Sequence, residues 1–368
     1  MRTYSPENER IKRAYFAYLK EAKGQSEASV DAAAEAISRF EAATTYRDFK
    51  SFHHEQAVAF KRRLGRSDSR GTKEKLSKAT QYATLAHLRR FFQWLVSQTG
   101  YKSRLTYTDA DYFKLSDKDS RVAVARRPRP APTLEQVRHT IMSMPSDTEI
   151  AQRNRALLAF ALLTGARDSA LASFKLKHVD LAAGSVFQDA RDVRTKFSKS
   201  FTTYFFPVGD GMREIASQWV GYLKGARLWG NEDPLFPATR VEVGASRQFE
   251  ATGIDRKPWS SAAAIRVIFK DAFAAAGLQY FNPHSLRSTL TRLGESMCKS
   301  PEEFKAWSQN LGHEGVLTTF LSYGNVQPQR QGEIIKALAH PQPASVGSAS
   351  DLAAELMRLM DARRPVEG

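Results

Sequence analysis

The chain has 368 residues, which predicts two domains, and 42% of them are hydrophobic, enough for ordinary globular cores. No apolar run approaches the length of a membrane span, and the first residues lack the apolar core of a secretory signal. The single cysteine, Cys298, excludes an intramolecular disulfide framework and a zinc site built from several thiolates. The net charge of +16 is typical of a protein that binds a polyanion, most often nucleic acid.

The charge is concentrated in the N-terminal third, whose sequence predicts helices. Residues 1–132 contain 27 basic and 15 acidic side chains, a net charge of +12. Helix-forming composition covers Lys12–Lys20, Ala28–Ala42 and Glu55–Arg63. A longer helix is predicted from an N-cap at Ser77 to a C-terminus at Gly100. Its apolar face comprises Tyr82, Leu85, Leu88, Phe92 and Leu95.

A basic segment at 61–78 and a basic connector at 117–132 are the expected contacts to a phosphate backbone. The connector contains three prolines and four arginines and predicts an extended chain between domains. A solvated surface is the alternative for any one of these side chains. The candidate contacts are Lys61, Arg62, Arg63, Arg66, Lys73, Lys75, Lys78, Arg126, Arg127 and Arg129.

The remaining sequence predicts a mixed domain at about 133–330. Thr133 and Gln136 form a capping box before a helix, and Arg153–Leu163 is apolar on nearly all sides, which predicts a buried helix. Two β-rich segments, Ser185–Lys196 and Phe201–Val208, predict a hairpin. Helical patterns return at Arg213–Leu223, Ser260–Ala276, Ser285–Cys298 and Pro301–Asn310. Residues 331–368 form a tail in which Leu352, Leu356, Leu359 and Met360 share one helical face.

Three short segments of this second domain contain an ordered set of polar side chains. Arg167 follows the turn Thr164-Gly165, His284 and Arg287 lie three residues apart at a helix start, and Tyr323 follows ten residues after His313. Each feature alone is common in proteins. Their combination and order are not.

The second domain resembles the catalytic domain of the tyrosine recombinases, the phage integrase family. TGAR resembles the family's first arginine box, PHSLRSTLTRLG its second, and LGHEGVLTTFLSY its histidine box and nucleophile. The resemblance implies a mainly helical fold with a small β-hairpin, in which a helical core-binding domain at 1–116 and the catalytic domain form a C-shaped clamp. It implies a metal-independent, site-specific enzyme that cleaves and rejoins double-stranded DNA through a 3′-phosphotyrosine, without a cofactor.

Elementary chemistry agrees with this implication. Two guanidinium groups bind phosphate oxygens in a planar, forked geometry, so Arg167 and Arg287 suit a pentacoordinate transition state. Tyr323 would be the nucleophile and needs neighbouring positive charge or a base, because its free pKa is about 10. The family pattern assigns phosphate and proton contacts to His284 and His313. It also places a lysine general acid on the hairpin, where we favour Lys196 over Lys199.

Some features stay open at this stage. The family often has an acidic residue three positions after the first arginine, where this chain has Ala170; the alternatives are that Asp168, Asp189 or Asp192 takes this role, or that no residue does. Within the enzyme class, a topoisomerase-like relaxer or a hairpin telomere resolvase would use the same groups, and a DNA-binding regulator is a non-catalytic alternative. We expect a cytoplasmic, nucleoid-associated protein that forms a tetramer on DNA through the amphipathic helix at Asp351–Arg363, docked in cis or in trans. The sequence leaves the DNA target and any accessory DNA-bending or directionality proteins undefined.

Overall fold

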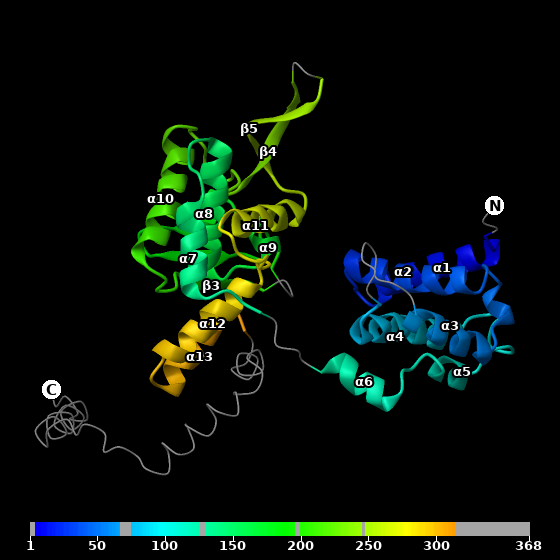
Figure 1. Cartoon of the computed structure of the whole chain (residues 1–368). Helices are drawn as coiled ribbons and strands as arrows, with labels where there is room; N and C mark the ends of the chain where they lie inside the picture. The colour runs from blue at the N-terminus through cyan, green and yellow to red at the C-terminus, as the bar shows by residue number, and fades with distance from the viewer. Residues whose placement is uncertain (1–3, 67–74, 126–129, 196–198, 245–246, 314–368) are drawn as a thin grey trace, which may run out of the picture. The chain divides into compact units, whose positions relative to one another are not determined.

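The computed structural model describes residues 4–66, 75–125, 130–195, 199–244 and 247–313. The chain divides into two compact units, one ending at Arg126 and the other beginning at Arg127 (Figure 1). Both are mainly helical, and the strands of the second form small antiparallel sheets, so the predicted fold class is confirmed. Among the described residues, no helix combines the length and apolar character needed to cross a bilayer.

The first unit is built around an aromatic core. The ring of Phe40 makes edge-to-face contacts with Phe60, Phe92 and Phe113 at centroid separations of 5.3–5.5 Å. These rings come from three helices and from the segment after α5, all distant in sequence, so the core joins them into one body. Its helical elements are α1 (Pro6–Ala17), η1 (Tyr18–Ala22), α2 (Glu27–Ala43), η2 (Phe49–Ser51), α3 (His54–Arg66), α4 (Lys78–Leu95), α5 (Tyr107–Asp111) and α6 (Asp117–Val124).

Helix α4 begins as predicted but ends earlier. The Ser77 side chain accepts a hydrogen bond from the backbone of Thr80, which confirms the N-cap. The helix ends at Leu95 rather than near Gly100, because Ser97 and Gln98 both donate side-chain hydrogen bonds to the carbonyl of Trp94 and so compete with the helical pattern.

The predicted apolar face of α4 is also wrong at one position. Four of its five members are buried, but Tyr82 is 42% exposed, because the buried face of the helix at this turn contains Gln81 and Thr84 instead.

The first half of the predicted connector is helical, which corrects the expectation of an extended chain over 117–132. Ser116 caps α6 by accepting from the backbone of Asp119, and acidic residues occupy the first turn, where they complement the helix dipole. The Asp119 carboxylate also pairs with the Lys78 ammonium at 3.0 Å, and α6 packs on α4. This helix therefore belongs to the first unit.

A buried polar network fixes the start of the first unit. The Asn8 side chain, fully buried, donates to the Glu41 carboxylate and to the Arg47 carbonyl, and it accepts from the backbone of Phe49. Lys12 balances the charge of Glu41 at 2.6 Å. Helix α1 is thereby tied both to α2 and to the loop that follows it.

Replacing Asn8 with alanine would leave several of these buried groups without a partner. We expect Asn8→Ala to lower the free energy of unfolding by about 2–4 kcal/mol, because each buried polar group left unsatisfied costs roughly 1–3 kcal/mol. Chemical denaturation would measure the loss, with the exposed Lys102→Ala as control. Equal stability of both variants would show that water replaces the Asn8 side chain without cost.

The second unit surrounds α8 (Glu149–Thr164), which is buried along most of its length as predicted. The capping box before α7 (Leu134–Ser143) is confirmed, since Thr133 and Gln136 exchange hydrogen bonds at 2.9 and 3.1 Å. The other helical elements are α9 (Asp168–Leu171), η3 (Leu176–His178), α10 (Asp210–Gly225), α11 (Ala263–Ala275), α12 (Ser285–Met297) and α13 (Pro301–Asn310).

Two antiparallel sheets complete this unit. The predicted hairpin is present but shorter, as β2 (Ser185–Gln188) and β3 (Phe201–Tyr204) pair with β1 (Val179–Asp180) in the order β1-β2-β3. A second hairpin of β4 (Pro237–Val243) and β5 (Phe249–Pro258) was not predicted. The apolar side chains of this hairpin are largely exposed, Phe249 by 82%. Because neither face is consistently buried, the sequence has no alternation of apolar and polar residues from which a strand could be predicted.

Candidate active site

The turn after α8 approaches the end of α13 closely. Gly165 has a left-handed conformation, with φ of +58°, and terminates α8. A Cβ atom at this position would lie 2.8 Å from the Leu311 side chain and 3.0 Å from that of Leu290. Only glycine fits both the conformation and the space, and Arg167 follows in extended backbone at the N-cap of α9.

Arg287, in the first turn of α12, is the most deeply buried of the predicted catalytic residues that the structure describes. The residue is only 5% exposed. Its guanidinium donates to the Gly165 carbonyl at 2.6 Å and to the Leu311 carbonyl at 2.5 Å. Burial, reinforced by the nearby positive charge of Arg167, lowers the pKa of Arg287 to about 9. The group is therefore still a cation at neutral pH.

His313 completes this cluster. Its Nε2 lies 3.0 Å from Nη2 of Arg287, and because a guanidinium only donates, the imidazole nitrogen accepts this bond. A neutral His313 then has its proton on Nδ1. The preceding Gly312 has φ of +67° and contacts the Phe201 ring, which a Cβ atom would approach to 2.6 Å.

The cluster has strong positive charge and no neutralising carboxylate among its described contacts. Arg167 is half-buried, and desolvation lowers its pKa. Within the described part of the chain, its side chain makes no hydrogen bond or ion pair. The guanidinium of Arg287, held by neutral acceptors, and the nearby guanidinium of Arg167 form a site suited to an anion such as a phosphate.

The carboxylates considered as partners of Arg167 are paired with other cations. Asp168 pairs with Arg266 at 2.8 Å, Asp189 with Arg191 at 2.7 Å, and Asp192 with Lys177 at 2.7 Å. The position three residues after Arg167 is occupied by the buried Ala170. The described residues therefore supply no carboxylate contact to the Arg167 guanidinium.

The other candidate catalytic side chains differ in placement. His284 is exposed at the N-cap of α12, one turn before Arg287, whose backbone N–H donates to the His284 carbonyl. Lys199 is exposed just before β3. Lys196 and Tyr323 lie outside the described residues.

The basic candidates of the first unit differ in exposure. Arg62, Arg63, Arg66 and Lys75 are exposed, whereas the ammonium of Lys61 donates to the Lys114 carbonyl and that of Lys78 pairs with Asp119. Lys73, Arg126, Arg127 and Arg129 lie outside the described residues.

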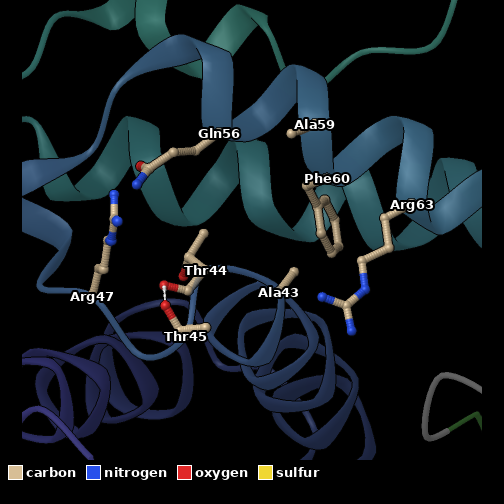
Figure 2. A pocket seen from close by; sticks show the side chains of 8 residues that line it. All are labelled: Ala43, Thr44, Thr45, Arg47, Gln56, Ala59, Phe60 and Arg63. Atoms are coloured by element: carbon tan, nitrogen blue, oxygen red, sulfur yellow. Dashed lines mark hydrogen bonds between the residues drawn. The ribbon is translucent and has the colours of Figure 1, made fainter.

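Arg63 also borders a cavity of about 260 Å³ between the end of α2 and α3. Figure 2 shows Arg47 and Arg63 at opposite sides of this cavity, with the Gln56 side chain beside Arg47. Neither Arg47 nor the cavity had been singled out from the sequence, because the loop after α2 has no distinctive motif.

The comparisons with known proteins agree with this geometry. The model of the phage integrase family matches residues 133–330, more than half of the chain, and the chain belongs to this family. Tyrosine recombinase XerC of Pseudomonas putida (strain W619) is 29% identical over 196 residues, which cover 53% of this chain and 55% of that protein. XerC of Escherichia coli (strain K12 / DH10B) is 24% identical over 277 residues, which cover 74% of this chain and 78% of that protein. The predicted class of enzyme, a tyrosine recombinase, is confirmed.

Solved structures show the same fold at low sequence identity. A lambda integrase (75–356) dimer bound to a COC′ core site has a TM-score of 0.60 and 16% identity, covering 87% of this chain and 97% of that chain. The XerH recombinase in a post-cleavage complex on a palindromic difH substrate also has a TM-score of 0.60 and 16% identity, covering 89% and 85%.

The two arginines of the site should matter for catalysis far more than for DNA binding. We expect Arg167→Ala or Arg287→Ala to slow strand cleavage at least 100-fold, because removal of one preorganised donor to a transition state typically costs that much. Single-turnover cleavage of a nicked duplex and a binding assay at fixed salt would separate the two effects.

The control is Arg292→Ala, which removes an exposed arginine from the same helix. If Arg287→Ala cleaved as fast as this control, the assignment of the anion site would be wrong.

Proposed function

We propose that Arg167, Arg287, His284, His313, a hairpin lysine and Tyr323 perform the strand cleavage and rejoining that define the phage integrase family. The observation that supports this assignment is the juxtaposition of Arg167 and Arg287 without a neutralising carboxylate among the described residues. A phosphodiester supplies the missing negative charge. Its non-bridging oxygens would bind the guanidinium groups, which stabilise the additional charge of the pentacoordinate transition state.

The reaction we propose is a transesterification at phosphorus. A bond forms between the tyrosine oxygen of Tyr323 and phosphorus while the bond from phosphorus to the 5′ oxygen breaks. The phenol proton leaves toward a neighbouring base, and a lysine of the hairpin donates a proton to the departing 5′ oxygen. Rejoining is the same step in reverse, with the 5′ hydroxyl of a DNA strand as nucleophile.

The histidines fit two different tasks. Because the Nε2 of His313 accepts from Arg287, the imidazole orients that guanidinium and keeps a polar face toward the phosphate. The exposed His284 lies one turn away, at a helix start that favours anions, and suits proton transfer with solvent. Lys196 and Lys199 both stay candidates for the general acid.

A covalent adduct is the direct test of this assignment. We expect the protein to accumulate a phosphotyrosyl adduct on a nicked suicide duplex, in which the cleaved fragment diffuses away, and we expect Tyr323→Phe to abolish the adduct while binding persists. Denaturing gels would detect the adduct.

The outcomes of this test distinguish the alternative activities. If wild-type protein formed no adduct on its own DNA site, a non-catalytic regulator would be the better assignment. Relaxation of supercoils without exchange between duplexes would favour a topoisomerase-like enzyme.

We also propose that the exposed basic side chains of the first unit and the arginines of the connector bind the DNA backbone. The excess of positive charge in residues 1–132 supports this role, because counterion release makes such contacts the main source of affinity. Among these side chains, Arg62, Arg66 and Lys75 are exposed, whereas Lys78 already pairs with Asp119.

Strand exchange joins two DNA sites, and we propose a tetramer bridged by Asp351–Arg363. An apolar groove of about 540 Å³ in the described part of the second unit would receive this helix. Among its lining residues are Phe206, Pro207 and Trp307. This surface matches in character the stripe of Leu352, Leu356, Leu359 and Met360 in the tail.

A substitution that blocks the groove should therefore reduce assembly on DNA as deletion of the tail does. We test this with two variants: deletion of residues 351–368, and Ala306→Glu, which places a charge in the groove. We expect each to reduce cooperative assembly on a two-site DNA at least tenfold, while single-site binding stays within twofold of wild type. Mobility-shift titrations would measure both. Unchanged cooperativity in the deletion would refute the bridge, and unchanged cooperativity in Ala306→Glu alone would move the helix to another surface.

A further inference from the structure

The four residues at 310–313 connect the β2–β3 hairpin with the arginine cluster. Leu311 accepts a hydrogen bond from Arg287 through its carbonyl, Gly312 contacts the Phe201 ring, and His313 contacts Arg287. Asn310, the last residue of α13, binds the hairpin itself. One short segment thus contacts both the group that would hold the phosphate and the hairpin that would supply the leaving-group proton.

Asn310 pairs with the open edge of β3 as another strand would. The backbone N–H of Tyr204 donates to the Asn310 Oδ1 at 2.7 Å, and the Asn310 Nδ2 donates to the Tyr204 carbonyl at 2.8 Å. In the described sheet β3 is an edge strand, so these two backbone groups point away from β2. The side-chain amide is the shortest group that can satisfy both at once.

A buried chain of hydrogen bonds extends this link through the hairpin. The Gln188 amide of β2 donates to the Thr203 hydroxyl of β3 at 3.0 Å, and that hydroxyl donates to the Asn310 carbonyl at 3.1 Å. Gln188 and Thr203 are 4% and 0% exposed. Both hairpin strands are therefore fixed to the end of α13.

We propose that Asn310 is a positioning residue, which holds the hairpin in register with Arg287 and His313 and so directs Lys199, the candidate general acid among the described residues, toward the departing 5′ oxygen. This inference rests on the proposed function. Lys199 lies two residues before Phe201, where the strand that Asn310 contacts begins. A shift of this strand would therefore move the lysine. The Tyr204 side chain is 62% exposed, so in the isolated protein water can replace the amide at the backbone groups of this residue, and its loss should displace the hairpin without unfolding the unit.

The test compares two leaving groups on the same DNA. In one substrate the scissile phosphate has its normal 5′ oxygen; in the other, sulfur replaces that oxygen, and the thiolate departs without receiving a proton because its pKa is far below that of an alcohol. We expect Asn310→Ala to slow cleavage of the oxygen substrate about 10- to 100-fold, in keeping with the roughly 100-fold or larger contribution of a positioned general acid. Cleavage of the sulfur substrate should stay within about threefold of wild type.

Three variants control for structural damage. Gln309→Ala removes an exposed amide from the adjacent position of α13 and should leave both rates unchanged. Asn310→Asp keeps the acceptor for the Tyr204 N–H but opposes a carboxylate to the Tyr204 carbonyl, and we expect it to be as slow as Asn310→Ala. Combining Asn310→Ala with alanine at the catalytic hairpin lysine should cost nothing beyond the loss of the lysine, because both changes remove the same proton transfer.

The outcomes separate this inference from the proposed function. An equal loss on both substrates, or wild-type rates on both, would overturn the positioning role while cleavage by wild-type protein still upheld the proposed function. If wild-type protein cleaved neither substrate on its cognate site, the proposed function would fail and this inference with it.

Discussion

The site depends on how Arg287 is kept charged inside the protein. A buried cation is costly unless its N–H groups are hydrogen-bonded, and here the carbonyls of Gly165 and Leu311 accept from it. A carboxylate would stabilise the buried group more strongly, but it would also cancel the charge that a phosphate needs. Neutral acceptors satisfy the N–H groups and leave the charge available, and the burial that this arrangement requires lowers the pKa of Arg287.

Arg153 shows what the same residue type does without a reactive role. It is 2% exposed, donates to the Pro237 carbonyl and the Thr239 hydroxyl, and lies over the Trp259 ring at 4.9 Å. Its described contacts hold the start of β4 against α8, and burial lowers its pKa to about 10. What distinguishes Arg287 is therefore its neighbours, because the guanidinium of Arg167 and the imidazole of His313, which come from other parts of the chain, lie near it.

The parts of this structure that the sequence predicts well are those fixed by neighbours along the chain. The caps at Ser77 and Thr133 depend on groups three residues away, and the arginine and histidine boxes are local motifs. The errors differ in origin: α6 has a local signal in the Ser116 cap and its acidic first turn, which the prolines and arginines after it obscure, whereas β4–β5 forms without an apolar alternation. The pairing of Asp168, Asp189 and Asp192 with other cations, and the bond from Asn310 to an edge strand, join residues whose spacing has no pattern to detect.

The described site thus separates fixed charge from proton exchange. The guanidinium of Arg287 is held by backbone carbonyls, so the transition-state stabilisation proposed for it would require no reorganisation during the reaction. His284 and Lys199 are exposed, where water can restore a proton after each step. A reversible reaction needs both properties, because cleavage and rejoining pass through the same charge distribution but move the proton in opposite directions. The segment 310–313 touches the rigid group and the hairpin together, and the reach of the exposed lysine is therefore set from inside the protein.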